Sequence, residues 1–264
     1  MSQPRSKIHF VPHGGGPLPI LGEPGHKALV DCLKSLEAEL HDASALIVVT
    51  AHWETEEIKV SGAAEPGMIF DYYGFPPETY TYSYPAPGAP DLAAEAIRHL
   101  AKAGLPGHLD AERGYDHGTF VPLMLMRPKA DIPVIQVSIL SSMDPAAHIA
   151  TGRALAPLLE TGAVLIGSGL SFHNLKAMLR NAPMENAEDK QFDDWLNGAI
   201  LGDDPERHLL AWKDAPAARF CHPREDHLLP LHVCLGAGLE AGLTPKPLFC
   251  DKVMGFQASG FSWS

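Results

Sequence analysis

Continuous apolar runs recur along the chain and predict the strands of a buried sheet. The runs at 45–51, 132–139 and 163–169 are rich in Val, Ile and Leu, and 8–11 is a shorter run of the same kind. An uninterrupted apolar run is typical of a strand that is covered on both faces, as in a parallel sheet packed between helices. We therefore expect a central sheet with parallel inner strands.

Segments with helical spacing separate these runs. Residues 24–41 carry one apolar face, composed of Ala28, Leu29, Cys32, Leu33, Leu36 and Leu40. A second helix is expected over 91–103, capped by Asp91 and ended by Gly104, and a third over 144–160. Residues 181–220 are polar and helical in pattern, with an apolar stripe formed by Phe192, Trp195, Leu196 and Ile200. This alternation of strands and helices predicts the α/β class.

Two further segments alternate in polarity and predict additional strands. Residues 56–62 suit a short strand, and 247–263 suit an antiparallel hairpin at the edge of the sheet. The stretch 64–90 is rich in aromatic residues, proline and glycine. Such a long loop in a compact domain is usually functional, so we expect it to pack beside the site as an apolar wall.

Composition and charge narrow the class of protein. The chain has 264 residues and a net charge of −12, which disfavours nonspecific binding to nucleic acid or to an anionic membrane. There is no apolar signal region near Met1 and no run of transmembrane length. The four cysteines form no close pair, as expected for reduced thiols in the cytoplasm. We expect one domain over residues 1–264.

Three histidines stand where predicted strands end. His13 begins the segment His-Gly-Gly-Gly-Pro, His52 follows the run 45–51, and His173 follows 163–169. The carboxyl ends of parallel strands share one edge of a sheet, where ligands gather in open α/β folds. A fourth histidine, His227, begins an apolar helical segment. Imidazole suits iron, zinc and copper, and three protein ligands leave positions open for substrate.

The residues alone leave several readings open. Each histidine taken singly also fits a structural role, and His13 fits a tight turn with an incidental imidazole. A carboxylate from Glu225 or Asp226 is an alternative third ligand, since oxygen-activating iron sites often combine two histidines with one carboxylate. His117, next to Asp116, is the best spare acid or base. Asp116 equally fits the role of a turn residue whose side chain is hydrogen-bonded to the backbone.

Other catalytic motifs are absent. The chain has no GxxxxGK[ST] phosphate loop and no HExxH helix, and the segment 167–169 does not fit GxSxG. The glycines at 236 and 238 follow a helix-like segment and not a strand, so they do not form a dinucleotide fingerprint.

Six short motifs, in order along the chain, resemble a known family. They are His13-Gly-Gly-Gly-Pro, Ala51-His52-Trp53, Gly74-Phe75-Pro76 with Tyr84-Pro-Ala-Pro-Gly88, Asp116-His117-Gly118, His173-Asn174-Leu175 and His227-Leu-Leu-Pro230-Leu231. This arrangement is similar to that of the 4,5-DOPA dioxygenase type of class III extradiol ring-cleavage dioxygenases, related to the protocatechuate 4,5-dioxygenase β subunit. The resemblance spans nearly the whole chain. The segment HGGG, in place of the family's HGS, is a departure that bears on the substrate pocket.

The resemblance implies a fold and a site. It implies a three-layer α/β/α sandwich with a mixed central sheet, ferrous iron, and extradiol cleavage of a catechol by O2. His13, His52 and His227 match the family's metal ligands. His173 matches its acid/base, which becomes a fourth ligand when zinc fills a resting site. His117 matches a histidine that hydrogen-bonds substrate or oxygen.

Two other functions and several details stay open at this stage. The same histidines suit a zinc-dependent hydrolase, and the fold also suits a non-catalytic binding protein. The sequence does not identify the catechol or say which basic residue would meet a carboxylate on it; the candidates are Arg113, Arg127, Lys176 and Arg219. A homodimer is expected only as the commonest assembly of soluble proteins.

Overall fold

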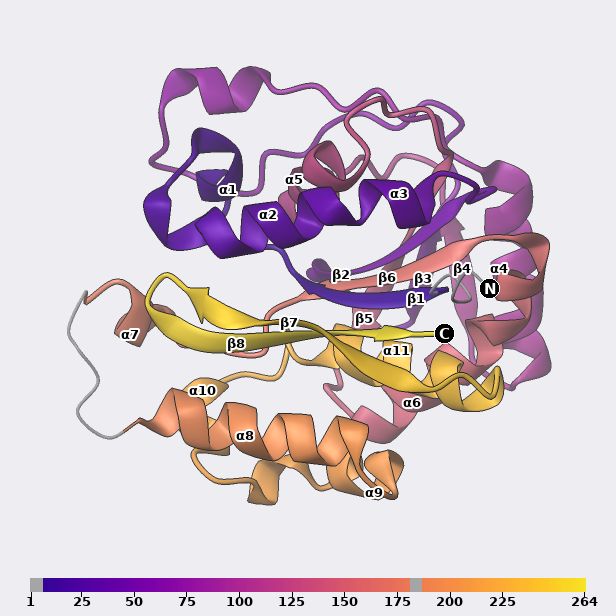
Figure 1. Cartoon of the computed structure of the whole chain (residues 1–264). Helices are drawn as coiled ribbons and strands as arrows, with labels where there is room; N and C mark the ends of the chain where they lie inside the picture. The colour runs from indigo at the N-terminus through magenta and orange to yellow at the C-terminus, as the bar shows by residue number, and fades with distance from the viewer. Residues whose placement is uncertain (1–6, 181–186) are drawn as a thin grey trace.

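A mixed sheet lies at the centre of the protein, in a computed structural model that describes residues 7–180 and 187–264. Within these residues the sheet has eight strands, in the order β4-β3-β5-β2-β6-β1-β8-β7. Helices cover both of its faces (Figure 1). The predicted α/β/α sandwich with a mixed central sheet is therefore confirmed.

The centre of the sheet is parallel. Strand β6 lies between β1 and β2 and runs parallel to both, and β2 continues the parallel order to β5. The outer strands introduce antiparallel pairs, β8 against β1 and β3 against β5. The strands are β1 (Ile8–Pro12), β2 (Leu46–Thr55), β3 (Ile58–Ser61), β4 (Gly107–Asp110), β5 (Val134–Leu140), β6 (Val164–Gly169), β7 (Pro245–Val253) and β8 (Phe256–Trp263). The carboxyl ends of β1, β2 and β6 thus lie side by side.

One face of the sheet is covered by an upper layer in Figure 1. Its helices are α1 (Leu18–Leu21), α2 (Lys27–Ser35), α3 (Glu37–Leu40) and α5 (His117–Met126). The predicted helix over 24–41 is divided, because a 3-10 turn occupies Pro24–His26 and the α-helical pattern is interrupted at Leu36. Its apolar face is nevertheless the predicted one, since Leu29, Leu33, Leu36 and Leu40 are buried.

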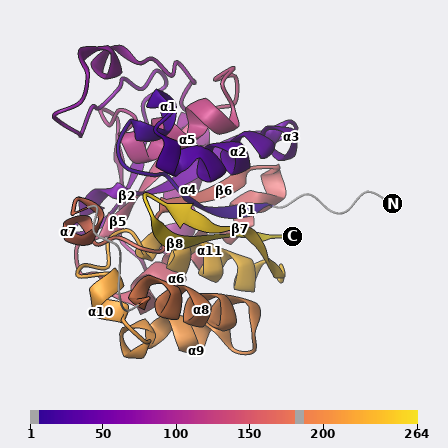
Figure 2. The ribbon, with the colours of Figure 1, turned by 60° about the vertical axis from the view of Figure 1, so that its left-hand side comes forward.

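The other face is covered by the lower layer. It contains α4 (Pro90–Lys102), α6 (Pro145–Leu155), α8 (Glu188–Leu201), α9 (Pro205–Leu210) and α11 (Leu229–Glu240). Helices α6 and α11 pack closely at Gly152. A Cβ atom at this position would lie only 2.0 Å from the Val233 carbonyl oxygen, so the contact requires glycine. Two short helices, α7 (Leu175–Met178) and α10 (Ala218–Cys221), lie at the same end of the molecule in both views (Figures 1 and 2).

Several boundaries differ from the prediction. Asp91 does not cap α4, which begins at Pro90 without a side-chain cap. The C-terminal hairpin forms as expected, but only β7 is at the edge, since β8 also pairs with β1. Strand β4 was not predicted.

The predicted helical segment 181–220 has a mixed outcome. Its first six residues lie outside the described part of the chain. The remainder forms α8, α9 and α10 with a 3-10 turn at Trp212–Asp214, because glycine and proline interrupt one continuous helix. Among the described residues, no helix combines the length and hydropathy needed to span a bilayer.

Candidate metal centre

The sheet brings the predicted histidines to one edge. His13 directly follows β1, and His173 lies four residues beyond the end of β6. His52 lies inside β2 and not after it, in the stretch where the pairing with β5 shifts register between Val49 and Glu54. His227 lies two residues before α11, and its carbonyl oxygen accepts the Leu170 N–H at 3.0 Å.

Three of these imidazole rings point their Nε2 atoms toward one another. The Nε2 atom of His52 lies 3.0 Å from Nε2 of His13 and 3.2 Å from Nε2 of His227. The ligand nitrogens of all three side chains lie within 4.8 Å of one another. His13 and His227 are buried, and His52 is half-buried.

The opposite ring nitrogen of two of these histidines is held by a polar partner. Nδ1 of His13 lies 3.0 Å from the Ser168 hydroxyl, which itself donates to the Gly118 carbonyl oxygen. The hydroxyl proton is therefore committed, so Nδ1 of His13 must be the donor. In the same way Nδ1 of His227 donates to Asp226 at 3.0 Å. Both Nε2 atoms are left with a lone pair facing the third imidazole.

Burial keeps these rings neutral. It lowers the pKa of His13 and of His227 well below 6.5, and the neighbouring histidines lower both pKa values further. The pKa of His52 falls to about 3, first because of burial and then because of His117, although Asp71 opposes the shift. A neutral imidazole is the form that binds a metal ion.

The arrangement fits a metal ion. Two nitrogens about 2.1 Å from one ion and at right angles to each other lie about 3 Å apart. The separations measured through His52 have this size. The ring protons of His13 and His227 lie on Nδ1, and Nδ1 of His52 faces the Asp71 carboxylate at 3.5 Å, which favours the proton there. The three Nε2 lone pairs then converge and repel one another unless a cation lies between them. The donor set is therefore suited to a divalent ion.

The glycine segment after His13 is a tight turn. Gly14 and Gly16 have φ angles of 81° and 53°, a region that favours glycine. The Gly15 N–H donates to Nε2 of His26 at 3.1 Å, and Nδ1 of His26 donates to Glu23 at 2.6 Å. This pair fixes the backbone that follows His13.

His117 is held by an acid that the sequence analysis missed. Asp71, in the 64–90 loop, accepts from both the backbone N–H and Nδ1 of His117 at 2.9 Å. Its second oxygen lies 3.5 Å from Nδ1 of His52. Although burial raises the pKa of Asp71, its contacts with His117 and His52 outweigh this and lower it to about 2. The carboxylate therefore joins the two histidines.

The neighbour of His117 in sequence has a different task. Asp116 caps α5 by accepting the Thr119 N–H at 3.1 Å, and the same oxygen accepts from the Thr50 hydroxyl at 2.8 Å. Its other oxygen accepts from Arg113 at 2.7 Å, and that guanidinium lies 4.9 Å from the centre of the Trp53 ring. The reading of Asp116 as a residue bonded to backbone is therefore correct.

The aromatic loop packs against the site, as expected. The Tyr72 ring lies 5.8 Å from the His117 ring and 5.5 Å from Phe75. The Tyr72 hydroxyl donates to the Thr79 carbonyl oxygen at 2.6 Å. These contacts make the loop an ordered wall of the site.

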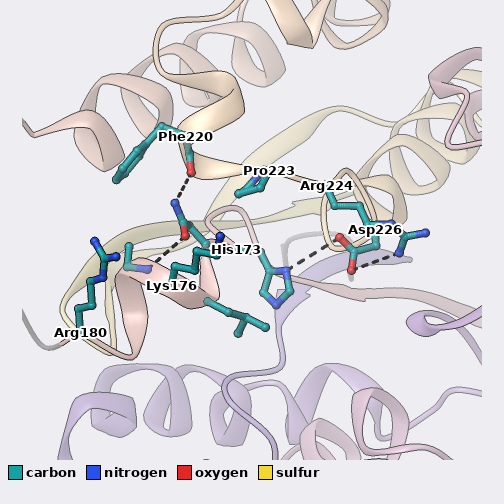
Figure 3. Close-up of a pocket in the computed structure, with 10 residues that line it drawn as sticks. His173, Lys176, Arg180, Phe220, Pro223, Arg224 and Asp226 are labelled. Atoms are coloured by element: carbon teal, nitrogen blue, oxygen red, sulfur yellow. Dashed lines mark hydrogen bonds and ion pairs between the residues drawn. The ribbon is translucent and has the colours of Figure 1, made fainter.

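His173 lies beside the three converging rings. It stacks on His227, with ring centres 3.4 Å apart and an angle of 18° between the planes. Its Nδ1 atom lies 3.9 Å from Asp226 (Figure 3). Burial lowers the pKa of His173, although Asp226 opposes this shift. The ring also lines a cavity of about 500 Å³.

The two rival carboxylates are engaged elsewhere. Glu225 accepts from Arg219 at 2.8 Å and lies 3.2 Å from the Lys213 ammonium, which lowers its pKa despite burial. Asp226 holds Nδ1 of His227. The geometry therefore favours His227 as the third donor, with Asp226 behind it.

Comparison with known proteins identifies the family. The family model described as the catalytic LigB subunit of aromatic ring-opening dioxygenase matches residues 9–258. The chain belongs to this family. It is accordingly an extradiol aromatic ring-opening dioxygenase, and members of this family are metal-dependent.

The similarity to individual relatives supports the same family assignment. The chain is 43% identical to "Dioxygenase tasH" of Hapsidospora irregularis over 95% of this chain and 83% of the relative. It is 36% identical to the 4,5-DOPA dioxygenase extradiol of Beta vulgaris, over 88% and 86%, and 35% identical to that of Escherichia coli K12, over 90% and 87%. A crystal structure of the uncharacterized protein JW3007 from Escherichia coli K12 superposes with a TM-score of 0.81 at 28% identity, covering 98% of this chain and all of that one.

Proposed function

We propose that the protein is a non-haem Fe(II) enzyme that opens the ring of a catechol beside its two hydroxyl groups, using O2. The observation that carries this proposal is the convergence of three neutral imidazoles through Nε2. The family supplies the class of reaction, whereas the metal, the substrate and the residue roles are our assignments.

His13, His52 and His227 are the proposed metal ligands. Three protein ligands leave positions open, as is typical of a catalytic rather than a structural site. When bound, ferrous iron supplies a common binding point and redox partner for the catechol oxygens and O2. Zinc is the expected occupant of a resting site, with His173, which stacks on His227, as the expected fourth ligand.

His173 is the proposed acid/base. Its Nδ1 atom faces Asp226, which leaves Nε2 to accept the proton of the second catechol hydroxyl. Asp226 stabilises the resulting imidazolium by its negative charge. The same Nε2–H later returns the proton to an oxygen atom as the O–O bond breaks.

His117 is the proposed hydrogen-bond donor to substrate or oxygen. Its Nδ1 is bound to Asp71, so Nε2 is the nitrogen that remains for a ligand. The aromatic loop around Tyr72 excludes water on this side of the ring. Exclusion of water strengthens each hydrogen bond in the site.

An oxygen-uptake assay tests the function. The purified protein is stripped of metal, loaded with Fe(II) under anaerobic conditions and mixed with a panel of catechols in an oxygen electrode. We expect one O2 consumed per catechol and a yellow ring-opened product. An iron-loaded protein that consumes no oxygen, but hydrolyses esters or amides when loaded with zinc, would contradict the proposal in favour of a zinc hydrolase. A protein with neither activity would favour a binding protein.

Three wider expectations belong with this proposal. Residues 1–264 form one catalytic domain, because the sheet runs from β1 near the start of the chain to β8 near its end. A cytoplasmic location is supported by the free thiols of Cys32, Cys221, Cys234 and Cys250. A homodimer and the lack of nucleic-acid or membrane partners stay predictions.

A further inference from the structure

A cavity next to His173 carries more positive than negative charge. Its volume is about 500 Å³. Lys176, Arg180 and Arg224 supply three cations, and Asp226 is the one acid among the described residues that line the cavity (Figure 3). The surplus is notable in a chain whose net charge is −12.

Two of the cations have no side-chain partner among the residues that the structure describes. Among the described residues, neither Lys176 nor Arg180 makes a hydrogen bond or ion pair with a side chain. Arg224 donates to Glu54 at 2.6 Å and lies 3.9 Å from Asp226. Lys176 and Arg180 are thus available to an anion that enters the cavity.

The acid of the cavity is engaged through one oxygen, while its Oδ1 atom has no hydrogen-bond partner among the described residues and faces His173. Asp226 accepts from Nδ1 of His227 at 3.0 Å and faces Nδ1 of His173 and the Arg224 guanidinium at 3.9 Å each. An ammonium group in this cavity would therefore meet two unpaired cations, Lys176 and Arg180, besides Arg224, which is paired with Glu54. Among the described lining residues its one counter-ion would be the Asp226 carboxylate, which already faces two histidines. Repulsion between like charges at this range disfavours it.

The cavity adjoins the proposed metal centre. His173 lines it and stacks on His227, so a ring bound at the metal has this space next to it. In Figure 3 His173 lies between Asp226 and Arg180, with Lys176 on the Arg180 side. Leu175, Phe220 and Pro223 add apolar lining. A catechol substituent with an apolar spacer and a terminal anionic group matches this arrangement, in which apolar lining lies beside Lys176 and Arg180.

Resting on the proposed function, we infer that this cavity binds an anionic substituent of the catechol, a carboxylate on a short apolar spacer with no ammonium group beside it. Lys176 and Arg180 are the residues that select it. The relatives from Beta vulgaris and Escherichia coli K12 are named for DOPA, whose side chain carries both a carboxylate and an ammonium. This chain would therefore prefer the simple acid to the amino acid.

Three ligands with the same ring and the same two-carbon spacer test the inference. They are 3,4-dihydroxyphenylpropionate, DOPA and dopamine, whose side chains carry charges of −1, 0 and +1. Binding is measured by anaerobic calorimetry on the zinc-loaded protein, and kcat/KM in an oxygen electrode on the iron-loaded protein. We expect the propionate to bind about tenfold more tightly than DOPA, and DOPA more tightly than dopamine; a tenfold step corresponds to about 1.4 kcal/mol.

Variants identify the residues responsible. Lys176→Gln combined with Arg180→Gln should reduce the propionate-to-dopamine affinity ratio by about tenfold or more. Lys102→Gln combined with Lys190→Gln, an equal loss of charge at exposed positions of α4 and α8, should leave the ratio as in the wild type. A double variant with the wild-type ratio would overturn the assignment of Lys176 and Arg180.

The two readouts separate this inference from the function on which it rests. A protein that binds the propionate most tightly but cleaves no catechol would refute the proposed function and retain the anion cavity. A protein that cleaves catechols but binds DOPA or dopamine at least as tightly as the propionate would refute the cavity inference alone.

Discussion

Asp71 accepts two hydrogen bonds from His117, one from its backbone N–H and one from Nδ1, each 2.9 Å long. The same carboxylate faces His52 across 3.5 Å. A loop residue therefore orients one proposed metal ligand and one proposed substrate-binding histidine at once. Partners of this kind fix the tautomer of a ligating imidazole and strengthen it as a ligand.

Replacing Asp71 tests this positioning role. In Asp71→Asn the amide can still accept from His117 with its oxygen, but its NH2 group would then face Nδ1 of His52. We expect the affinity for zinc to fall by about 10- to 100-fold, as measured by competition with a chelator. Asp91→Asn, the same change at an exposed position of α4, is the control. An unchanged affinity in Asp71→Asn would remove Asp71 from the metal centre.

A variant of His173 distinguishes metal binding from turnover. Because it is proposed as an acid/base and not as a required ligand, His173→Ala should keep its iron and lose about 10²–10⁴-fold in kcat. Iron content and oxygen uptake are measured on the same sample. His99→Ala, on helix α4, serves as the control. Full activity in His173→Ala would contradict the acid/base role, and loss of iron would make His173 a ligand.

Gly169 links the end of β6 to the segment that carries His227. A Cβ atom at this position would lie 2.2 Å from the His227 carbonyl oxygen. Gly169→Ala should therefore displace His227, lower the free energy of unfolding by about 1–3 kcal/mol and weaken zinc binding. Urea unfolding and the chelator titration measure the two effects.

The control is another glycine. Gly198 lies on the exposed side of α8, and a Cβ atom there has no neighbour within 4 Å. Gly198→Ala should stabilise the protein by up to about 1 kcal/mol, because alanine favours the helix. Zinc binding in Gly169→Ala equal to that in Gly198→Ala would show that His227 does not depend on this close contact.

Stability should fall in acid because of a buried histidine away from the metal centre. His232 is fully buried, and burial lowers its pKa to about 4, although the carbonyl oxygens of Leu209 and Leu228 near its nitrogens oppose the shift. Nearby His148 lowers this pKa and Asp144 raises it. As the pH falls below 6.5 the unfolded chain binds this proton first, so the contribution of His232 to stability, present above pH 6.5, is lost toward pH 4.

The loss should be measurable by urea unfolding. Between pH 7 and pH 5 this single group lowers the free energy of unfolding by about 2 kcal/mol. In His232→Gln the decrease should be smaller by that amount, whereas His208→Gln, at a half-exposed position, should retain it. The same pH dependence in His232→Gln and in the wild type would contradict this account.

The convergence of distant histidines was predictable because the ends of buried parallel strands can be located in the sequence and lie at one edge of the sheet. Parallel strands buried on both faces read as apolar runs, and three of the four runs, 8–11, 45–51 and 163–169, were followed by a histidine within a few residues. The order β2-β6-β1 then places His13, His52 and His173 at neighbouring positions. His227 was a candidate because it begins an apolar helical segment, and the family resemblance added its assignment as a metal ligand.

Other features were not predictable from local pattern. Asp71 lies in a loop without periodicity, and only the folded chain brings it to His117, 46 positions away. Ser168 reads as part of an apolar strand, yet its hydroxyl sets the tautomer of His13. Strand β4 is short and partly exposed, so its residues have no apolar run to mark it. The interruption of the helix at Leu36 left its buried face unchanged, so the apolar spacing did not reveal it.

The central claim is that His13, His52 and His227 hold one divalent ion. The most direct test is the metal content of protein loaded anaerobically with Fe(II) and desalted, measured by mass spectrometry for the wild type, His13→Ala, His52→Ala and the exposed control His108→Ala. We predict one iron per chain in the wild type and in His108→Ala, and almost none in the other two. A wild type that binds no iron, or a His13→Ala or His52→Ala protein that retains one iron per chain, would contradict the account.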